Sequence, residues 1–267
     1  MSLRNTVRAG PTMLRVGLAG AVAYRAELLV WALATTLPLV MLALWSSVAQ
    51  QAPIGRFGQP QFTAYFLSTF IVRQLTGSWA FWEMNSDVKS GTLGTRLLRP
   101  VHPLFAYAAE NLAAIPLRLL IALPVAAVLL ATVGARCVTH DPAEWAIFAL
   151  AVSGAWLLTL LTNLIVGCAA FFLESSVKLM DLYLVFFFVL SGYLIPVDLF
   201  PATLRRIVEE LPFRYQVGFP VEVMTGGHSR ISAIDHLARQ WAWIAVLLLA
   251  TRAAWLRGLR RFAAFGG

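Results

Sequence analysis

Few residues of this chain have the types and spacing that catalysis requires. Ser153 and His236 are the one serine and histidine pair that would suit a membrane-embedded protease, in which the two side chains face each other from different spans. His236 lies at the edge of an apolar run, which argues against that role. The four histidines are dispersed along the chain, and the two cysteines show no metal-ligand spacing. The sequence therefore predicts neither a catalytic residue nor a metal site.

A nucleotide-binding loop is also missing from the sequence. The phosphate-binding motif needs Gly-Lys followed by Ser or Thr, and the only lysines, Lys89 and Lys178, each follow a valine. The chain is therefore expected not to be an enzyme and to hold no cofactor of its own. Any ATP hydrolysis that drives it must take place on a partner subunit.

One arginine lies inside an apolar run. Arg73 is about eleven residues into the run Phe62–Trp82, where a charge costs about 2.5 to 3.5 kcal/mol on insertion scales. It should therefore face protein or water, with Glu110 or a backbone carbonyl as its candidate partner. Two roles stay open, a residue that lines or gates a substrate route and a structural tie between the second and third spans.

The stretch from Phe81 to Leu104 is polar and much longer than a connection between two spans needs, which suggests a segment that docks on something. Asn85 or Ser86 is a candidate cap for a short helix there, and Gly91 or Gly94 is a candidate end. The alternative is a solvated loop. The charged residues of the stretch include Asp87, Lys89, Arg96 and Arg99.

The composition places these residues in an integral membrane protein. The chain has 267 residues, of which 59% are hydrophobic and only 13% are charged. A net charge of +8 could indicate nucleic-acid binding, but the arginines are scattered between apolar runs, so membrane topology explains them better and no nucleic-acid partner is expected. No removable signal peptide is apparent, and the first span should serve as the signal.

Six apolar runs are the predicted transmembrane helices of an all-α fold, because about 20 apolar residues cross a bilayer. The fifth run has 16 residues and would rise only about 24 Å, so its outer end should lie below the outer surface. The runs are Leu28–Ala49, Phe62–Trp82, Leu104–Val133, Trp145–Leu173, Met180–Ile195 and Leu237–Leu256. They form a single six-span domain over residues 28–257.

Residues 1–27 carry four arginines among apolar residues and are predicted to form an amphipathic interfacial helix, with a frayed basic tail as the alternative. Residues 258–267 form a basic cytoplasmic tail. Residues 196–225 are rich in proline and contain an amphipathic helix, Pro201–Leu211, with Leu204 and Ile207 on its apolar face. Backbone of this kind at membrane depth needs protein or water around it, so a re-entrant outer hairpin is expected.

Charge counting predicts that both termini are cytoplasmic. The short outer loops then carry only Arg56 and Arg136, as the positive-inside rule requires. This orientation places the polar segment 83–103 in the cytoplasm. Twelve of the 21 basic residues then lie on inner segments or inner span ends: Arg4, Arg8, Arg15, Arg25, Lys89, Arg96, Arg99, Lys178, Arg252, Arg257, Arg260 and Arg261.

Two motifs in this six-span order resemble a known family. Asp-Val-Lys-Ser-Gly-Thr-Leu, followed by Leu-Leu-Arg-Pro, lies between the second and third spans, and Leu-Ser-Gly-Tyr-Leu-Ile-Pro-Val-Asp-Leu-Phe-Pro closes the fifth. Together they are similar to the permease subunits of type-2 ATP-binding-cassette exporters, in particular to a group of short bacterial permeases. The resemblance covers nearly the whole chain.

The resemblance implies a role for each segment. The segment 83–103 would hold a coupling helix that inserts into a groove of the ATPase, the N-terminal helix would be the connecting helix, and Leu190–Leu211 would be the re-entrant hairpin that closes the extracellular side. Arg73, Glu110, Leu204 and Ile207 become candidates for the substrate route or its gate. The residues that fall in the coupling helix are Asp87, Lys89, Gly91, Thr92 and Leu93.

The resemblance also implies partners. Two copies of a separate ATPase subunit would supply ATP and Mg²⁺, and a second permease, the same chain or a sister chain, would complete a complex in the bacterial inner membrane. An amphipathic or lipid-like substrate is expected, and membrane lipids surround the chain. The alternative function is a non-transporting membrane scaffold or assembly factor, which would have no ATPase partner and would tolerate Arg73→Ala. A secondary transporter is disfavoured because no inverted repeat is visible.

Overall fold

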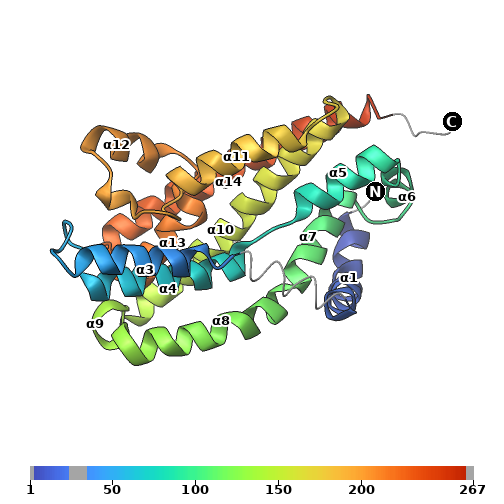
Figure 1. Ribbon diagram of the computed structural model, residues 1–267. Helices are drawn as coiled ribbons and strands as arrows, with labels where there is room; N and C mark the ends of the chain where they lie inside the picture. Colours follow the sequence, from blue (N-terminus) through green and yellow to red (C-terminus); the bar gives the residue numbers. More distant parts are fainter. Residues whose placement is uncertain (1–2, 24–34, 263–267) are drawn as a thin grey trace.

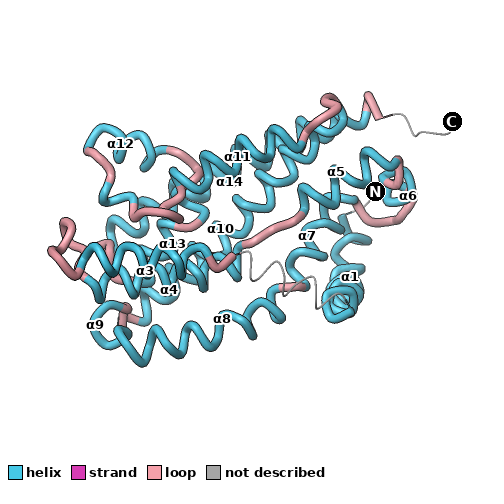
Figure 2. Tube along the Cα trace, viewed as in Figure 1, coloured by secondary structure: helices cyan, strands magenta, loops and turns pink. Residues whose placement is uncertain are grey.

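The computed structural model describes residues 3–23 and 35–262, and in these ranges the chain forms helices and turns without a β-strand (Figures 1 and 2). The predicted all-α class is therefore confirmed. The helices are α1 (Leu3–Ala23), α3 (Leu37–Ala49), α4 (Gln59–Thr76), α5 (Ala80–Ser90), α6 (Leu93–Leu97), α7 (Pro103–Ala113), α8 (Ile115–Leu129), α9 (Ala135–Cys137), α10 (Pro142–Cys168), α11 (Val177–Leu190), α12 (Ala202–Glu210), α13 (Gly218–Met224) and α14 (Arg230–Leu259).

Three helical segments of the described residues are long and apolar enough to cross a membrane: Pro103–Val133, Pro142–Phe171 and Arg230–Leu259. They correspond to the predicted third, fourth and sixth spans. The second of them is the central one, since 56% of its most apolar window is buried, against 22% for each of the others. Its main helix, α10, lies against α14 along most of its length and also contacts α4, α5 and α13.

The predicted second span, Phe62–Trp82, is wrong in one respect, because the structure breaks it into α4 and α5. Gly77 is extended and ends α4. The carbonyl of Gly77 accepts a hydrogen bond from Arg118, and the Trp79 amide donates to Asn111 Oδ1 at 3.0 Å. Side chains of α7 and α8 thus replace the hydrogen bonds that a continuous helix would have made.

Other boundaries also differ from the prediction. The helix of the polar segment begins at Ala80, so Asn85 and Ser86 lie inside α5 and do not cap it. Gly91 does end α5, in the left-handed conformation with φ +77°. The fifth apolar run forms a helix only to Leu190, because the chain turns at Gly192, whose φ is +84°.

Two predictions on the N-terminal part lie partly outside the described residues. The described part of the predicted first span, Leu28–Ala49, is a short apolar helix, α3. The described part of the predicted interfacial helix is α1, which lies against α7. The predicted basic tail, 258–267, is described only as far as residue 262.

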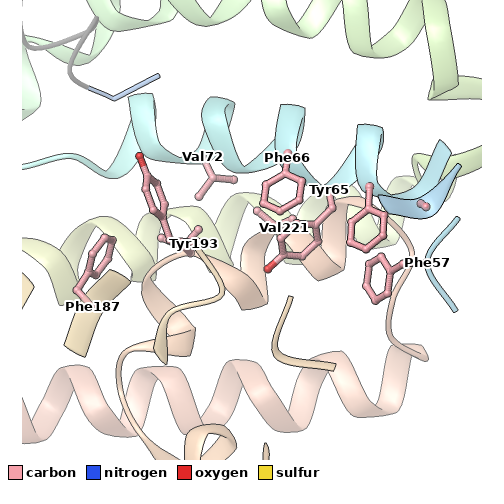
Figure 3. Close-up of a cluster of buried hydrophobic side chains, with 10 residues drawn as sticks. Phe57, Tyr65, Phe66, Val72, Phe187, Tyr193 and Val221 are labelled. Carbon is pink, nitrogen blue, oxygen red and sulfur yellow. The ribbon is translucent and has the colours of Figure 1, made fainter. Parts of the chain in front are cut away.

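The segment after α11 folds back into the helical bundle. The Tyr65 hydroxyl donates to the Gly192 carbonyl at 2.8 Å, and the Gly218 amide donates to the Ser191 carbonyl at the same distance. Figure 3 shows Tyr193 and Val221 of this segment packed among side chains of α4 and α11. The predicted amphipathic helix Pro201–Leu211 is α12, which begins and ends within one residue of those bounds.

Gly154 allows the close contact between α10 and α14, and this contact leads to a prediction. A β-carbon on Gly154 would lie 2.6 Å from Gln240 Oε1, and Gln240 is held in place by hydrogen bonds of 2.9 Å to the carbonyls of Ala151 and Tyr215. Gly154→Val should therefore destabilise the fold by about 1–3 kcal/mol, as overpacking does. The measurement is the thermal-unfolding midpoint of the purified protein in detergent.

The matched control is Ser153→Val, because Ser153 is the neighbouring residue on the exposed side of α10. This variant should unfold at the temperature of the parent protein. Equal midpoints for the Gly154→Val variant and the parent would show that the contact between the two helices does not limit stability.

Candidate functional site

A network of charged side chains holds the polar segment together at one end of the bundle. Arg96 Nε lies 2.6 Å from Asp87 Oδ2, and Arg96 Nη1 lies 3.0 Å from Glu110 Oε1. The Tyr107 hydroxyl donates to Asp87 Oδ2 at 2.7 Å, and the Arg96 guanidinium also lies 4.6 Å from the centre of the Tyr107 ring. The network joins α5, α6 and α7, so these three elements are held as one unit.

The turn between α5 and α6 is ordered by its own side chains. The Thr92 hydroxyl donates to Asp87 Oδ1 at 2.9 Å, and the left-handed Gly91 lets the chain reverse before it. Leu93 is fully buried with Met84 and other core residues. Outside the turn, Lys89 Nζ donates to the Leu173 carbonyl at 2.7 Å, which connects α5 to the loop after α10. The five predicted coupling residues thus lie at the end of α5, in the turn that follows it and at the start of α6.

The structure adds a residue that the sequence reasoning missed. Leu98 is 87% exposed directly after α6, whereas its neighbour Leu97 packs against the core. Single exposed leucines are common on protein surfaces, so the exposure of Leu98 makes it available for contact with a partner but does not by itself identify one. The sequence signal was the Leu-Leu pair before Arg99-Pro100, since one of the two leucines had to point away from the core.

The residues suggested for the substrate route are not brought together. Glu110 is paired with Arg96 instead of Arg73, because α7 lies beside α5 while α4 lies beside α8. Arg73 instead places its guanidinium 4.8 Å from the ring centre of Phe187 and 5.7 Å from that of Tyr193. Leu204 and Ile207 lie on α12, where both side chains are exposed, Ile207 by 55%.

The serine and the histidine considered for protease chemistry contact different partners. The Ser153 hydroxyl donates to the Ala149 carbonyl on the exposed side of α10. The His236 ring packs against His228, with 4.8 Å between ring centres, and against the rings of Tyr215 and Phe219. Within residues 3–23 and 35–262, no three His, Cys, Asp or Glu side chains form a group that could hold a metal ion.

A mostly apolar cavity of about 840 Å³ lies between α1, α5 and α7. Glu83 lines it, and Trp79 Nε1 donates to Glu83 Oε1 at 2.9 Å. Burial raises the pKa of the Glu83 carboxyl, the nearby carboxylate of Glu110 acts in the same direction, and the pKa reaches about 8. Glu83 is therefore mainly protonated at neutral pH, while Arg96 beside it has its pKa raised by the carboxylates of Glu110 and Asp87 despite burial.

These features define a class of protein, a helical membrane protein that crosses the bilayer several times and carries a braced polar segment at one end. The comparison with known families specifies the class. The family description "ABC-2 family transporter protein" matches residues 29–266, so the chain belongs to this family of transporter membrane proteins. Members of the family associate with an ATPase subunit. No curated protein matches the chain.

The raised pKa of Glu83 makes stability depend on pH. The pKa of Glu83 is about 8 in the folded state, whereas an ordinary glutamate has a pKa of 4.5, so the folded state retains a proton that the unfolded state releases as pH rises. The contribution of Glu83 to stability is therefore complete below pH 4.5 and declines up to about pH 8. The unfolding midpoint should fall between pH 6 and 8.5, and Glu83→Gln should reduce that fall.

The control for this titration is Glu174→Gln, the same substitution at an exposed glutamate in the loop after α10. It should leave the pH dependence as it is in the parent protein. A fall of equal size in the parent and in the Glu83→Gln variant would contradict a proton on Glu83.

Proposed function

We propose that the chain is the permease subunit of an ATP-binding-cassette export complex, in which two copies of a separate ATPase subunit hydrolyse ATP. Family membership makes an ATPase partner the expected source of energy. The observation that carries the proposal is the polar segment 83–103, which is held by the Arg96 network and in which Leu98 is exposed to a partner. The residues Asp87, Lys89, Gly91, Thr92 and Leu93 then shape the docking surface from within.

The contacts of the segment suggest how a partner's movement reaches the membrane helices. Arg96 links the segment to α7 through Glu110, and Lys89 links it to the end of α10 through the Leu173 carbonyl. Hydrogen bonds made by charged groups are strong, so we expect α5 and α6, which these two contacts hold, to move as one rigid unit. When the ATPase pair closes, a push on Leu98 therefore displaces α5, α7 and the inner end of α10 together.

The proposed topology has six spans with both termini in the cytoplasm of a bacterial inner membrane. It is supported by the arrangement in Figure 1, where α5, α6 and the C-terminal end of α14 lie at one end of the bundle and α12 lies at the other. The first end also carries Arg96, Arg99 and the basic tail, which the positive-inside rule assigns to the cytoplasm. In this topology α1 lies along the inner membrane surface.

A second permease, identical or related, would complete the route. The exposed face of α11 supports this part of the proposal, because it presents large apolar side chains outward while Phe187 on its other face meets Arg73. Arg73 then lies directly behind the surface where the two permeases would meet. An amphipathic or lipid-like substrate suits a route with mostly apolar walls. The exposed side chains of α11 are Leu182, Val185, Phe186 and Val189.

The test of the docking surface is Leu98→Asp, made in the full chain and co-expressed with an ATPase subunit that co-purifies with the parent protein. The charge should weaken the contact with the ATPase at least about tenfold, because a central apolar contact typically contributes 1.4 kcal/mol or more. The fold should survive, since the Leu98 side chain is 87% exposed. Co-purification of the ATPase, quantified against the parent protein, is the measurement.

Ile231→Asp is the matched control, because Ile231 is 84% exposed and lies at the start of α14, at the other end of that helix from the coupling segment. This variant should retain the ATPase. Retention by both variants would contradict the assignment of the segment after α5 as the coupling element.

A further inference from the structure

A second cavity, of about 590 Å³, lies at the end of the bundle that carries α12. Its walls come from segments that are distant in the sequence: the loop before α4, the segment around α12, the turn 214–216, and the start of α14. The walls are polar and hold three arginines. The side chains that the argument uses are Arg56, Asp198, Arg205, Glu209, Arg214 and His228.

Arg214 is the buried residue of this cavity. Its side chain is 1% exposed, and its Nη2 donates to Glu222 Oε2 at 2.6 Å. Its Nη1 lies 3.6 Å from Glu209 Oε1, which is too long for a hydrogen bond. In the part of the chain that the structure describes, neither Nε nor Nη1 of Arg214 has a hydrogen-bond acceptor. Arg214 lines the cavity, and two of its donor groups are buried without a hydrogen-bond acceptor.

The carboxylates of the cavity are already engaged. Asp198 Oδ1 lies 2.7 Å from Arg205, and its other oxygen pairs with Arg56. Glu209 Oε1 accepts from Arg205 Nε at 2.9 Å. Behind the wall, Glu222 Oε2 is shared between Arg214 and His228, which lies 2.7 Å away. Among the described residues, no carboxylate oxygen here is buried without a partner.

This asymmetry indicates the chemistry of the ligand. The unmatched groups are hydrogen-bond donors of a buried cation, and leaving such donors unpaired is costly. A ligand that satisfies them must bring acceptor atoms, and an oxyanion presents several to a planar guanidinium at once. Arg56 and Arg205, with side chains 49% and 42% exposed, are the more accessible arginines of the cavity, and both are paired with Asp198.

We propose that this cavity binds the phosphate or carboxylate group of an anionic ligand, with Arg214 Nε and Nη1 as the buried donors. The cavity is larger than a single oxyanion, so the ligand's remaining atoms have room within it or beyond its mouth. α12 carries Arg205 on the cavity side and the exposed Ile207 on its other face. This site can be tested independently of the proposed coupling to an ATPase, because the purified chain should bind the anionic ligand without a partner.

The experiment uses the full chain in a neutral detergent, with binding measured by titration calorimetry. Three probes separate the possible sources of the oxyanion: inorganic phosphate, dihexanoyl phosphatidic acid, and dihexanoylglycerol, which lacks the phosphate. Binding of both phosphate compounds indicates a free oxyanion site, and binding of phosphatidic acid alone indicates a lipid headgroup site. Either result, with no binding of dihexanoylglycerol, supports the proposal.

Neighbouring arginines on α12 provide a matched pair of variants. Arg205 lines the cavity, whereas Arg206, the next residue, is exposed and does not line it. Arg205→Ala should weaken binding several-fold and Arg206→Ala should not change it. Arg214→Lys keeps the charge beside Glu222 but removes the planar donor set, and it should weaken binding about tenfold or more.

Two results would overturn the proposal. One is that neither phosphate compound binds to the parent protein. The other is that Arg205→Ala and Arg206→Ala weaken binding equally, because that would indicate general attraction to surface charge. If Arg214→Lys fails to give a monodisperse protein, the comparison of Arg205→Ala with Arg206→Ala decides the question alone.

Discussion

The break between α4 and α5 is the feature on which the arrangement of this chain depends. In a membrane, backbone groups that leave a helix must find partners within the protein, because the lipid offers none. Here Arg118 donates to the Gly77 carbonyl, and Asn111 accepts from the Trp79 amide. The same Arg118 lies 4.5 Å from the centre of the Trp79 ring. Because α7 and α8 supply these groups, α5 can take a direction of its own, beside α7, and bring its polar end to the coupling segment.

The two polar ends of the molecule use charge in different ways. At the end that carries α5 and α6, Arg96 is shared between two carboxylates and stacks on Tyr107, which leaves a satisfied and rigid unit. At the other end, Arg214 is more deeply buried yet keeps donors without an acceptor among the described residues. A buried ion pair gains little stability over an apolar replacement. The incomplete pairing of Arg214 is consistent with the proposed anion site, and the complete pairing of Arg96 is consistent with the proposed coupling role.

The sequence was informative where the signal is local. Apolar run length predicted six spans, and three of them are long apolar helices among the described residues. Helix amphipathicity predicted α12, and glycine chemistry offered Gly91 or Gly94 as the end of α5, which is Gly91 in the structure. It failed where distant residues decide the outcome. Gly77 breaks a helix because of Arg118, which lies 41 positions away, and Glu110 meets Arg96 instead of Arg73 because of how the helices lie side by side. The cavity around Arg214 joins four segments, and no periodicity in the sequence brings these together.

Arg73 shows how a charge can be kept within an apolar bundle with no carboxylate paired to it among the described residues. Its guanidinium lies against the faces of Phe187 and Tyr193, from α11 and the turn that follows it. Cation–π contacts lower the cost of the charge but do not neutralise it. The positive charge of Arg73 therefore still acts on its surroundings, and α11 shields it on one side. Phe187 and Tyr193 belong to the segment that leads to α12. A shift of α11 would therefore change the electrostatic potential that Arg73 produces at α12. The tie made by Arg73 thus runs from α4 to α11 and to the turn that leads to α12.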